Sequence, residues 1–179
     1  PVLQPSGLGR QMTLVAPQPL DAAHRVEAFD CGKPPLTEWL LRHAHQAQGS
    51  GSARTFVARD GLRAAGYYGL TVGQIDTLDA PDTIRRGMGQ YPIPLVVLAR
   101  LAVDLDYQRR GLGVSLLQDA IRRSLAVAEH AGIRALLTQP LDAQADVFYR
   151  RFGFESLPQG ERHLILLLKD ARRQVQDVG

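Results

Sequence analysis

The chain has 179 residues, of which 45% are apolar and 22% charged, and its formal net charge is +3. These values fit one soluble globular domain with a single core, and the mild positive charge does not by itself indicate nucleic acid binding. No apolar run approaches the roughly 20 residues of a membrane span, the single cysteine excludes an internal disulfide, and no residue cluster has metal-ligand spacing. We therefore expect neither a membrane segment nor a metal site.

Short elements separated by glycine and proline are predicted for the first half of the chain. In order they are a disordered tail over 1–11, a strand over Met12–Ala16 ended by Pro17 and Pro19, a helix from Asp21 through Ala28, a helix capped by Thr37 and running towards Gln48, and a flexible link over Gly49–Ser52. Asp60-Gly61 then predicts a hairpin between strands at Arg54–Arg59 and Ala64–Val72.

The second half of the chain begins with a long polar segment, Gly73–Pro94, which in a compact domain is either disordered or functional. Leu95–Val103 is a nearly continuous apolar run, typical of a central strand covered on both faces. Gly111–Ala131 has the i, i+4 apolar stripe of an amphipathic helix. The remaining predicted elements are strands at Ile133–Thr138, Phe154–Leu157 and His163–Leu168 and a helix at Asp142–Phe152.

This order of elements predicts a mixed α/β or α+β domain around one sheet. We place the domain at 12–169 and expect a polar C-terminal tail at 170–179.

A glycine-rich turn joins the apolar strand to the amphipathic helix. It reads Gln108-Arg109-Arg110-Gly111-Leu112-Gly113. Such a turn presents unpaired backbone N–H groups at the positive end of a helix dipole, which favours a phosphate or pyrophosphate. The dinucleotide fingerprint and the P-loop are both excluded, because neither the GxGxxG spacing nor a GKS or GKT follows.

The pattern Gln-x-x-Gly-x-Gly after a Leu-x-Val strand resembles the acetyl-CoA site of the GNAT superfamily of N-acetyltransferases. The element order matches that fold as well, which implies a single α+β domain with a central mixed, mostly antiparallel sheet flanked by helices. The resemblance implies acetyl-CoA as cosubstrate, with the pantetheine arm along the strand and the pyrophosphate on the turn. The cofactor-binding residues it implies are Leu101, Ala102, Val103, Gln108, Arg109, Arg110, Gly111, Leu112 and Gly113.

The run Phe148-Tyr149-Arg150-Arg151-Phe152-Gly153-Phe154 resembles the F-Y-x-x-x-G-F segment of the same superfamily. There the tyrosine hydroxyl protonates the departing thiolate, which implies that Tyr149 is the catalytic general acid. The alternative for this run is a set of core aromatic side chains, and we favour that interpretation for the phenylalanines.

No glutamate on the central strand offers a general base. Arg100 interrupts its apolar run, and a buried arginine must either pair with a carboxylate such as Asp104 or reach a substrate anion. An α-amine with a pKa near 7.7–8.0 is substantially neutral at physiological pH, so such an acceptor needs chiefly proximity and an acid for the thiolate.

Residues 29–44 carry a narrower resemblance. Phe29-Asp30-Cys31-Gly32, Leu36 and Trp39-Leu40 resemble the opening of the GNAT toxins of bacterial toxin–antitoxin pairs, and the central strand with Arg100 matches that group too. The resemblance implies acetylation of the α-amine of aminoacyl-tRNA, a block of translation, a cytoplasmic location, a homodimer and a ribbon-helix-helix antitoxin. The residues expected to contact tRNA are Arg100, Lys33, Arg85 and Arg86. Pro140 departs from the family pattern before the tyrosine helix, which bears on amino-acid preference.

Two other functions compete with the toxin hypothesis. One is a GNAT enzyme that acetylates a protein N-terminus or a small-molecule amine. The other is a non-catalytic module that binds CoA or an antitoxin, which would not change its behaviour on losing the Tyr149 hydroxyl.

Overall fold

One seven-stranded sheet runs through the molecule in the computed structural model, which describes residues 11–159 and 162–176. Its order is β1-β2-β3-β4-β5-β7-β6; β4 and β5 are parallel and the other five pairs antiparallel. The strands are β1 (Leu14–Pro19), β2 (Arg54–Asp60), β3 (Arg63–Ile75), β4 (Ile93–Val103), β5 (Ala135–Thr138), β6 (Glu155–Ser156) and β7 (Leu164–Leu167). The predicted mixed, mostly antiparallel sheet is therefore confirmed.

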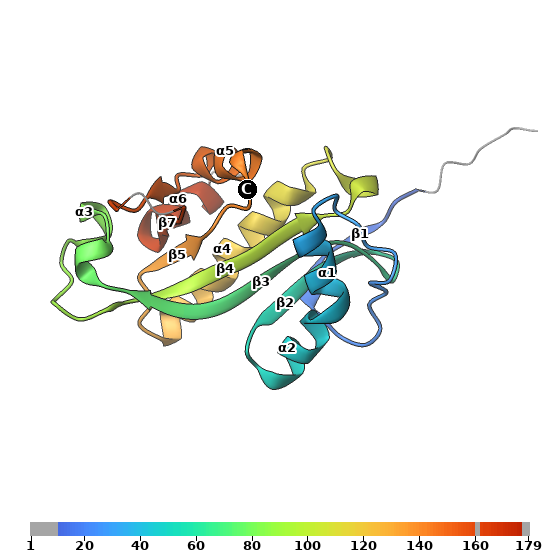
Figure 1. Ribbon diagram of the computed structural model, residues 1–179, viewed down its shortest axis with the longest axis horizontal. Helices are drawn as coiled ribbons and strands as arrows, with labels where there is room; N and C mark the ends of the chain where they lie inside the picture. The colour runs from blue at the N-terminus through green and yellow to red at the C-terminus, as the bar shows by residue number, and fades with distance from the viewer. Residues whose placement is uncertain (1–10, 160–161, 177–179) are drawn as a thin grey trace, which may run out of the picture.

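Helices flank both faces of this sheet (Figure 1). They are α1 (Pro34–Arg42), α2 (Ala44–Ser50), α3 (Asp82–Arg85), α4 (Leu112–His130), α5 (Ala143–Arg151) and α6 (Leu168–Gln176), with 3-10 turns η1 (Thr77–Asp79) and η2 (Leu105–Tyr107). Within the described ranges, none of them is long and apolar enough to cross a membrane.

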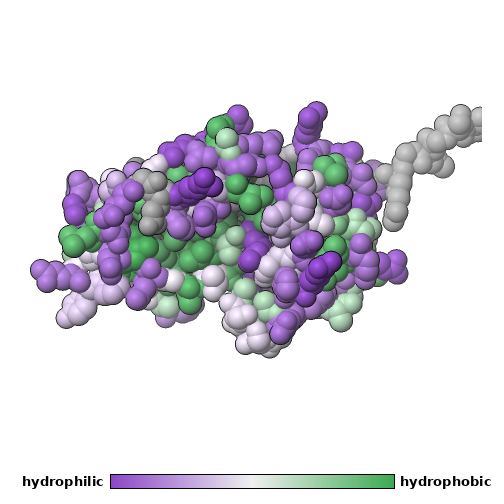
Figure 2. All heavy atoms as spheres, in the orientation of Figure 1, coloured by the Kyte–Doolittle hydropathy of each residue, from purple (hydrophilic) through white to green (hydrophobic). Residues whose placement is uncertain are grey.

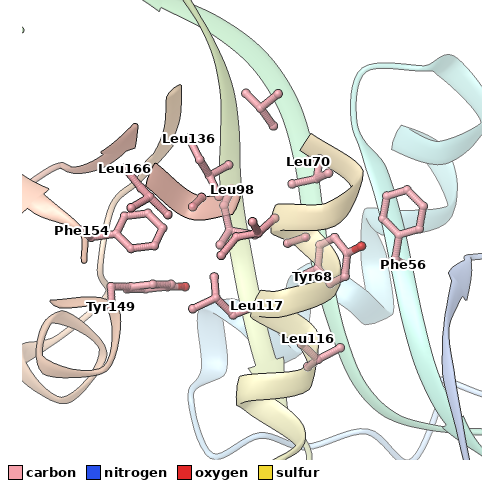
Figure 3. Close-up of a cluster of buried hydrophobic side chains, with 14 of the residues drawn as sticks. Phe56, Tyr68, Leu70, Leu98, Leu116, Leu117, Leu136, Tyr149, Phe154 and Leu166 are labelled. Carbon is pink, nitrogen blue, oxygen red and sulfur yellow. The ribbon is translucent and has the colours of Figure 1, made fainter. Parts of the chain in front are cut away.

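The two faces of the sheet pack into different clusters, as the alternation of side chains along a strand requires. Phe56 and Ala58 of β2 join the core beneath α4, whereas Val57 between them joins the cluster beneath α1 and α2. Figure 3 shows the α4 side of this core, with Leu116 and Leu117 of α4 against the strands. The apolar stripe predicted for this helix is confirmed.

A β-bulge in the central strand β4 changes this alternation. Gly69 of β3 pairs with Arg100 and the next residue, Leu70, pairs with Leu98, so Ala99 has no partner in the register. A bulge shifts the side-chain phase and bends the strand. As a result Leu98 and Leu101 both face the α4 core, while Ala102 joins the cluster beneath α1.

The helix predicted from Asp21 through Ala28 is wrong. Asp21 Oδ1 accepts from the N–H of Ala23 in a local turn. The backbone of Arg25 instead joins the hairpin, where its N–H donates to Leu62 O and its carbonyl accepts from Ala64 N. These bonds remove the backbone groups that a helix would use.

Three further boundaries differ from the sequence prediction. Pro17 and Pro19 lie within β1, which proline tolerates because this strand is at the sheet edge. The first predicted long helix begins earlier, with Pro34 in its first turn, and is broken at His43 into α1 and α2. Thr37 does not cap it; its hydroxyl accepts from Cys31 N at 3.1 Å.

The segment predicted as a long loop, Gly73–Pro94, is largely ordered. It contains the end of β3, η1, α3 and the start of β4, with Ile84 fully buried. Similarly, α6 covers most of the predicted polar C-terminal tail, and Ala171 is buried in the core. The predicted N-terminal tail lies outside the described residues except for Gln11, as do residues 177–179.

Gly66 on β3 is required by close packing. An added Cβ would lie 2.9 Å from Leu116 Cδ1 and 3.2 Å from Ala102 O. We expect Gly66→Ala to lower the free energy of unfolding by about 1–3 kcal/mol, because neither neighbour can move freely. Urea unfolding measures this change. Gly49→Ala is the matched control: nothing lies within 4 Å of that position in α2, so alanine should stabilise by up to about 1 kcal/mol. Equal effects of the two variants would contradict the packing argument.

Candidate active site

A cavity of about 420 Å³ opens where β4 parts from β5. The two strands pair only from Leu95 to Leu98 of β4, so the strand edge beyond the bulge has no β5 partner. The cavity is lined by Cys31, Gly32, Lys33, Leu36, Leu101, Ala102, Val103, Leu105, Gln108, Gly113, Leu141, Asp142, Gln144, Ala145, Phe148 and Tyr149. Residues predicted from three separate motifs therefore meet at one site.

The predicted anion-binding turn reaches this cavity through Gln108 and Gly113, whereas Arg109, Arg110, Gly111 and Leu112 are not among the residues that line it. Gly111 has φ +79° and caps α4, and Arg109 also has a left-handed φ of +62°. The first backbone bond of this turn runs from Ser115 N to Gly111 O, so the N–H groups before it have no intrahelical acceptor. Together with the positive end of the 19-residue helix α4, these groups can hold a pyrophosphate.

Gly113 lies where α4 approaches the central strand. An added Cβ would be 3.8 Å from Val103 Cγ2 and 3.9 Å from the Phe148 ring. The absence of a side chain here leaves a channel between the turn and the unpaired edge of β4. An extended chain with amide groups, such as a pantetheine arm, can add to this edge in the way a peptide adds to a sheet. The residues therefore fit acetyl-CoA.

The Gln108 side chain forms hydrogen bonds within the protein, although its motif implies a cofactor-binding residue. Its Nε2 donates to Val103 O at 2.9 Å and to Cys31 O at 3.1 Å. The amide therefore joins the end of β4 to the segment before α1, and only the backbone of Gln108 remains for an anion. Arg110 points elsewhere as well, with Nη1 3.2 Å from Met12 Sδ.

Tyr149 lies on the face of α5 that lines the cavity, and it is 5% exposed. Its ring packs against Phe148 and Phe154, and its hydroxyl points towards Leu117 in Figure 3. Burial raises the pKa of the phenol to about 12, partly offset by a hydrogen bond with Thr138. The Thr138 hydroxyl is itself held by its bond to Leu98 O, which is 2.9 Å long. With its pKa raised to about 12, Tyr149 is protonated at neutral pH.

Arg100 does not form the ion pair with Asp104 that we considered. The Asp104 carboxylate accepts from Arg63, from Asp30 N and from Asp106 N. The Arg100 guanidinium instead lies over the Trp39 ring, 4.1 Å from its centroid, and burial lowers its pKa. The positive charge of Arg100 is therefore stabilised by a cation–π interaction with Trp39.

The other predicted tRNA contacts lie in two places. Lys33 is at the cavity, where its Nζ forms an ion pair with Asp142. Arg85 and Arg86 are at α3, at the opposite end of the sheet from α1 in Figure 1, and the structure does not bring them to the cavity. Arg85 pairs with Asp82, and the carbonyl of Arg86 accepts from Arg134.

Sequence reasoning missed two polar side chains of the site, Thr138 and Asp142. Asp142 caps α5, where its Oδ1 accepts from Ala145 N at 2.9 Å. A capping aspartate is visible in a sequence, but its partner Lys33 is 109 positions away and no local pattern connects them. In the part of the chain that the structure describes, no group of three or more His, Cys, Asp or Glu could hold a metal ion.

Three comparisons place this geometry among known proteins. A model of the acetyltransferase (GNAT) domain matches residues 51–156. The chain is 42% identical over 163 residues to a tRNA-acetylating toxin of Mycobacterium tuberculosis, covering 90% of this chain and 97% of that protein. AtaT complexed with acetyl-methionyl-tRNAfMet is similar with a TM-score of 0.83 and 25% identity, over 90% of this chain and 99% of that chain. A variant of AtaT bound to acetyl-CoA and to the C-terminus of the antitoxin AtaR gives a TM-score of 0.77 and 24% identity, over 90% and 97%.

Proposed function

Because this chain belongs to the GNAT acetyltransferase family, we propose that it is a toxin that acetylates the α-amine of aminoacyl-tRNA and so blocks translation. The observation that carries the proposal is the 42% identity, over nearly the whole chain, to a tRNA-acetylating toxin. The cavity supports it, since it combines an anion-binding turn, an open strand edge and a buried protonated phenol.

Acetyl-CoA supplies an acetyl group activated as a thioester. The backbone N–H groups from Arg109 to Gly113 would hold its pyrophosphate, and the main chain of Leu101–Val103 would hold its pantetheine arm. As the acceptor nitrogen forms the amide bond and the bond to sulfur breaks, Tyr149 would donate its phenolic proton to the leaving sulfur, and the proton released by the nitrogen would restore the phenol. Thr138 keeps the hydroxyl in place through the bond described above.

The cavity offers little general-base assistance to the acceptor amine. Among the described residues that line the cavity, Asp142 is the one carboxylate, and it caps α5 by accepting from Ala145 N. An amine that is neutral near pH 8 needs no strong base, whereas a lysine side chain near 10.4 would need one. The site therefore suits an α-amine, and Arg100 remains the proposed contact to the tRNA beside it. Arg85 and Arg86 could contribute only to a substrate long enough to reach α3.

The pH dependence of acetyl transfer should reflect the ionisation of the acceptor α-amine and not that of Tyr149. Below about pH 8 we expect kcat/KM to rise with pH as the α-amine loses its proton. Above that, the rate should stay level to pH 10, because the raised pKa of about 12 keeps Tyr149 protonated. Rapid-quench acetylation of charged tRNA at pH 6–10 measures this, before the aminoacyl ester hydrolyses. A fall in rate with an apparent pKa near 9 would contradict the role given to Tyr149.

The proposed partners follow the same family. A ribbon-helix-helix antitoxin would neutralise the toxin, and the cytoplasm, where charged tRNA occurs, would be its place of action.

We also propose a homodimer. Val72, Leu78 and Tyr91 are at least 71% exposed around the β3–β4 connection, and such apolar side chains mark interaction surfaces. Figure 2 shows apolar side chains gathered at this end of the visible face. Sedimentation analysis of the purified chain tests the dimer, and a monomer at all concentrations would exclude it.

Transfer of label from acetyl-CoA to a pool of charged tRNA tests the function. Uncharged tRNA and free amino acids serve as controls, and an amine and peptide panel tests the other GNAT activities. Label on charged tRNA alone supports the proposal. Label only on peptides or small amines would replace the tRNA substrate while leaving an N-acetyltransferase, and no transfer to any acceptor would favour a binding module.

A further inference from the structure

A four-residue segment, Asp30–Lys33, contributes Cys31, Gly32 and Lys33 to the lining of the cavity and is fixed to its anion-binding side. Leu105 N donates to Asp30 O at 2.8 Å, and Asp30 N donates to Asp104 Oδ2 at 3.0 Å. Gln108 Nε2 adds the bond to Cys31 O described above. Three bonds thus join this segment to the stretch that leads into the pyrophosphate turn.

On its other side the same segment reaches α5 through one ion pair. Lys33 Nζ binds Asp142 Oδ2, while Asp142 Oδ1 stays on Ala145 N at the start of that helix. Both Lys33 and Asp142 line the cavity, so the pair connects its two walls.

The two charges can exchange partners at little cost. The side chains of Lys33 and Asp142 are 41% and 33% exposed, and ion pairs this open to water are weak. Lys33 holds the pKa of the Asp142 carboxyl below its usual range. Of the described residues that line the cavity, Lys33 is the one cation, and it is the last residue of the segment that is fixed beside the anion-binding turn.

We propose that Lys33 is a ligand for the phosphates of CoA that Asp142 holds in reserve: the Lys33–Asp142 pair closes the cavity, and the anionic cofactor opens it by taking Lys33 from Asp142. The proposal rests on the acetyl-CoA site of the proposed function. A pyrophosphate carries more charge than one carboxylate, and lysine's flexible stem lets its ammonium move between nearby anions. Lys33 would then bind the cofactor and not, as the family resemblance implied, the tRNA.

Two substitutions that break the same pair distinguish this role from a structural one. Lys33→Met removes the cation and should weaken CoA binding about tenfold or more, because a charge-assisted contact is lost. Asp142→Asn frees Lys33 and should tighten CoA binding about two- to fivefold. Asparagine caps helices as well as aspartate, so α5 and Tyr149 keep their places. Lys33→Arg keeps the charge and should stay within about threefold of the native affinity.

Isothermal calorimetry with CoA and with acetyl-CoA measures these affinities without relying on turnover. Opposite shifts in the two variants support the proposal. If both variants weaken binding alike, the pair only maintains the cavity's shape and the proposal fails. It also fails if Lys33→Met leaves CoA affinity unchanged and raises only the KM for charged tRNA, because Lys33 then contacts tRNA. No CoA binding by the native chain would instead refute the proposed acetyl-CoA site itself.

Discussion

Tyr149→Phe should lower kcat for acetyl transfer by about 100- to 10,000-fold and leave acetyl-CoA affinity within about threefold of native. The substitution removes the one proton donor proposed for the leaving thiolate and keeps the ring that packs against Phe148 and Phe154. Thr138 still donates to Leu98 O, so the loss of stability should be only about 1 kcal/mol. Rapid-quench kinetics on charged tRNA, beside calorimetry with acetyl-CoA, separate the two effects.

Tyr68→Phe is the matched control for this prediction. Tyr68 is a fully buried tyrosine in the same core cluster, but its hydroxyl donates to Asp119 at 2.5 Å, away from the cavity. Its removal leaves a partly buried carboxylate short of one donor, which should cost about 1–3 kcal/mol of stability while kcat stays near native. If both variants lost activity to the same degree, the effect would be structural and Tyr149 would not be the acid.

Gly113→Leu should weaken acetyl-CoA binding by about 100-fold or more. The added side chain would start 3.8 Å from Val103 and 3.9 Å from Phe148 and extend into the channel between the turn and β4. Leucine is a good helix former, so the start of α4 should fold as before. Calorimetry gives the affinity, and thermal unfolding checks that the fold is intact.

Gly113→Ala provides the graded control. Its Cβ would make ordinary contacts with both neighbours, so we expect a smaller loss of affinity than with leucine. Retention of native affinity in the leucine variant would show that the pantetheine arm does not pass between α4 and β4. That outcome would require a different position for the cofactor along the cavity.

The parts of this protein that were predicted correctly have local causes. The β2–β3 hairpin follows from its turn residues, and β4, the glycine turn and α4 follow from an apolar run, a cap and a stripe within some 40 consecutive residues. The helix expected at Asp21 does not form because the backbone of Arg25 is hydrogen-bonded to the β2–β3 hairpin. Local helix propensity does not account for such a contact with a distant segment. The long loop was misjudged because Ile84 is buried by strands distant in the chain.

For the candidate site as well, the features with local causes were predicted and the contacts between distant residues were not. Gly113 of the glycine turn and Tyr149 belong to two contiguous motifs, and both line one cavity. Other contacts of the site join residues that belong to different elements. They are the hydrogen bond between Tyr149 and Thr138, the cation–π contact of Arg100 with Trp39, and the ion pair of Lys33 with Asp142. Such pairs depend on how the elements pack, and no spacing rule predicts them.

The position of the prolines in β1 restricts how this sheet can grow. Pro17 and Pro19 offer no N–H to a further strand on that side, and on the other side β6 is only two residues long. The edge of β4 that lines the cavity has no β5 partner, so an extended polypeptide could add there through main-chain hydrogen bonds. A peptide inhibitor that binds at this edge would have to compete with the cofactor, and its potency should fall as the acetyl-CoA concentration rises.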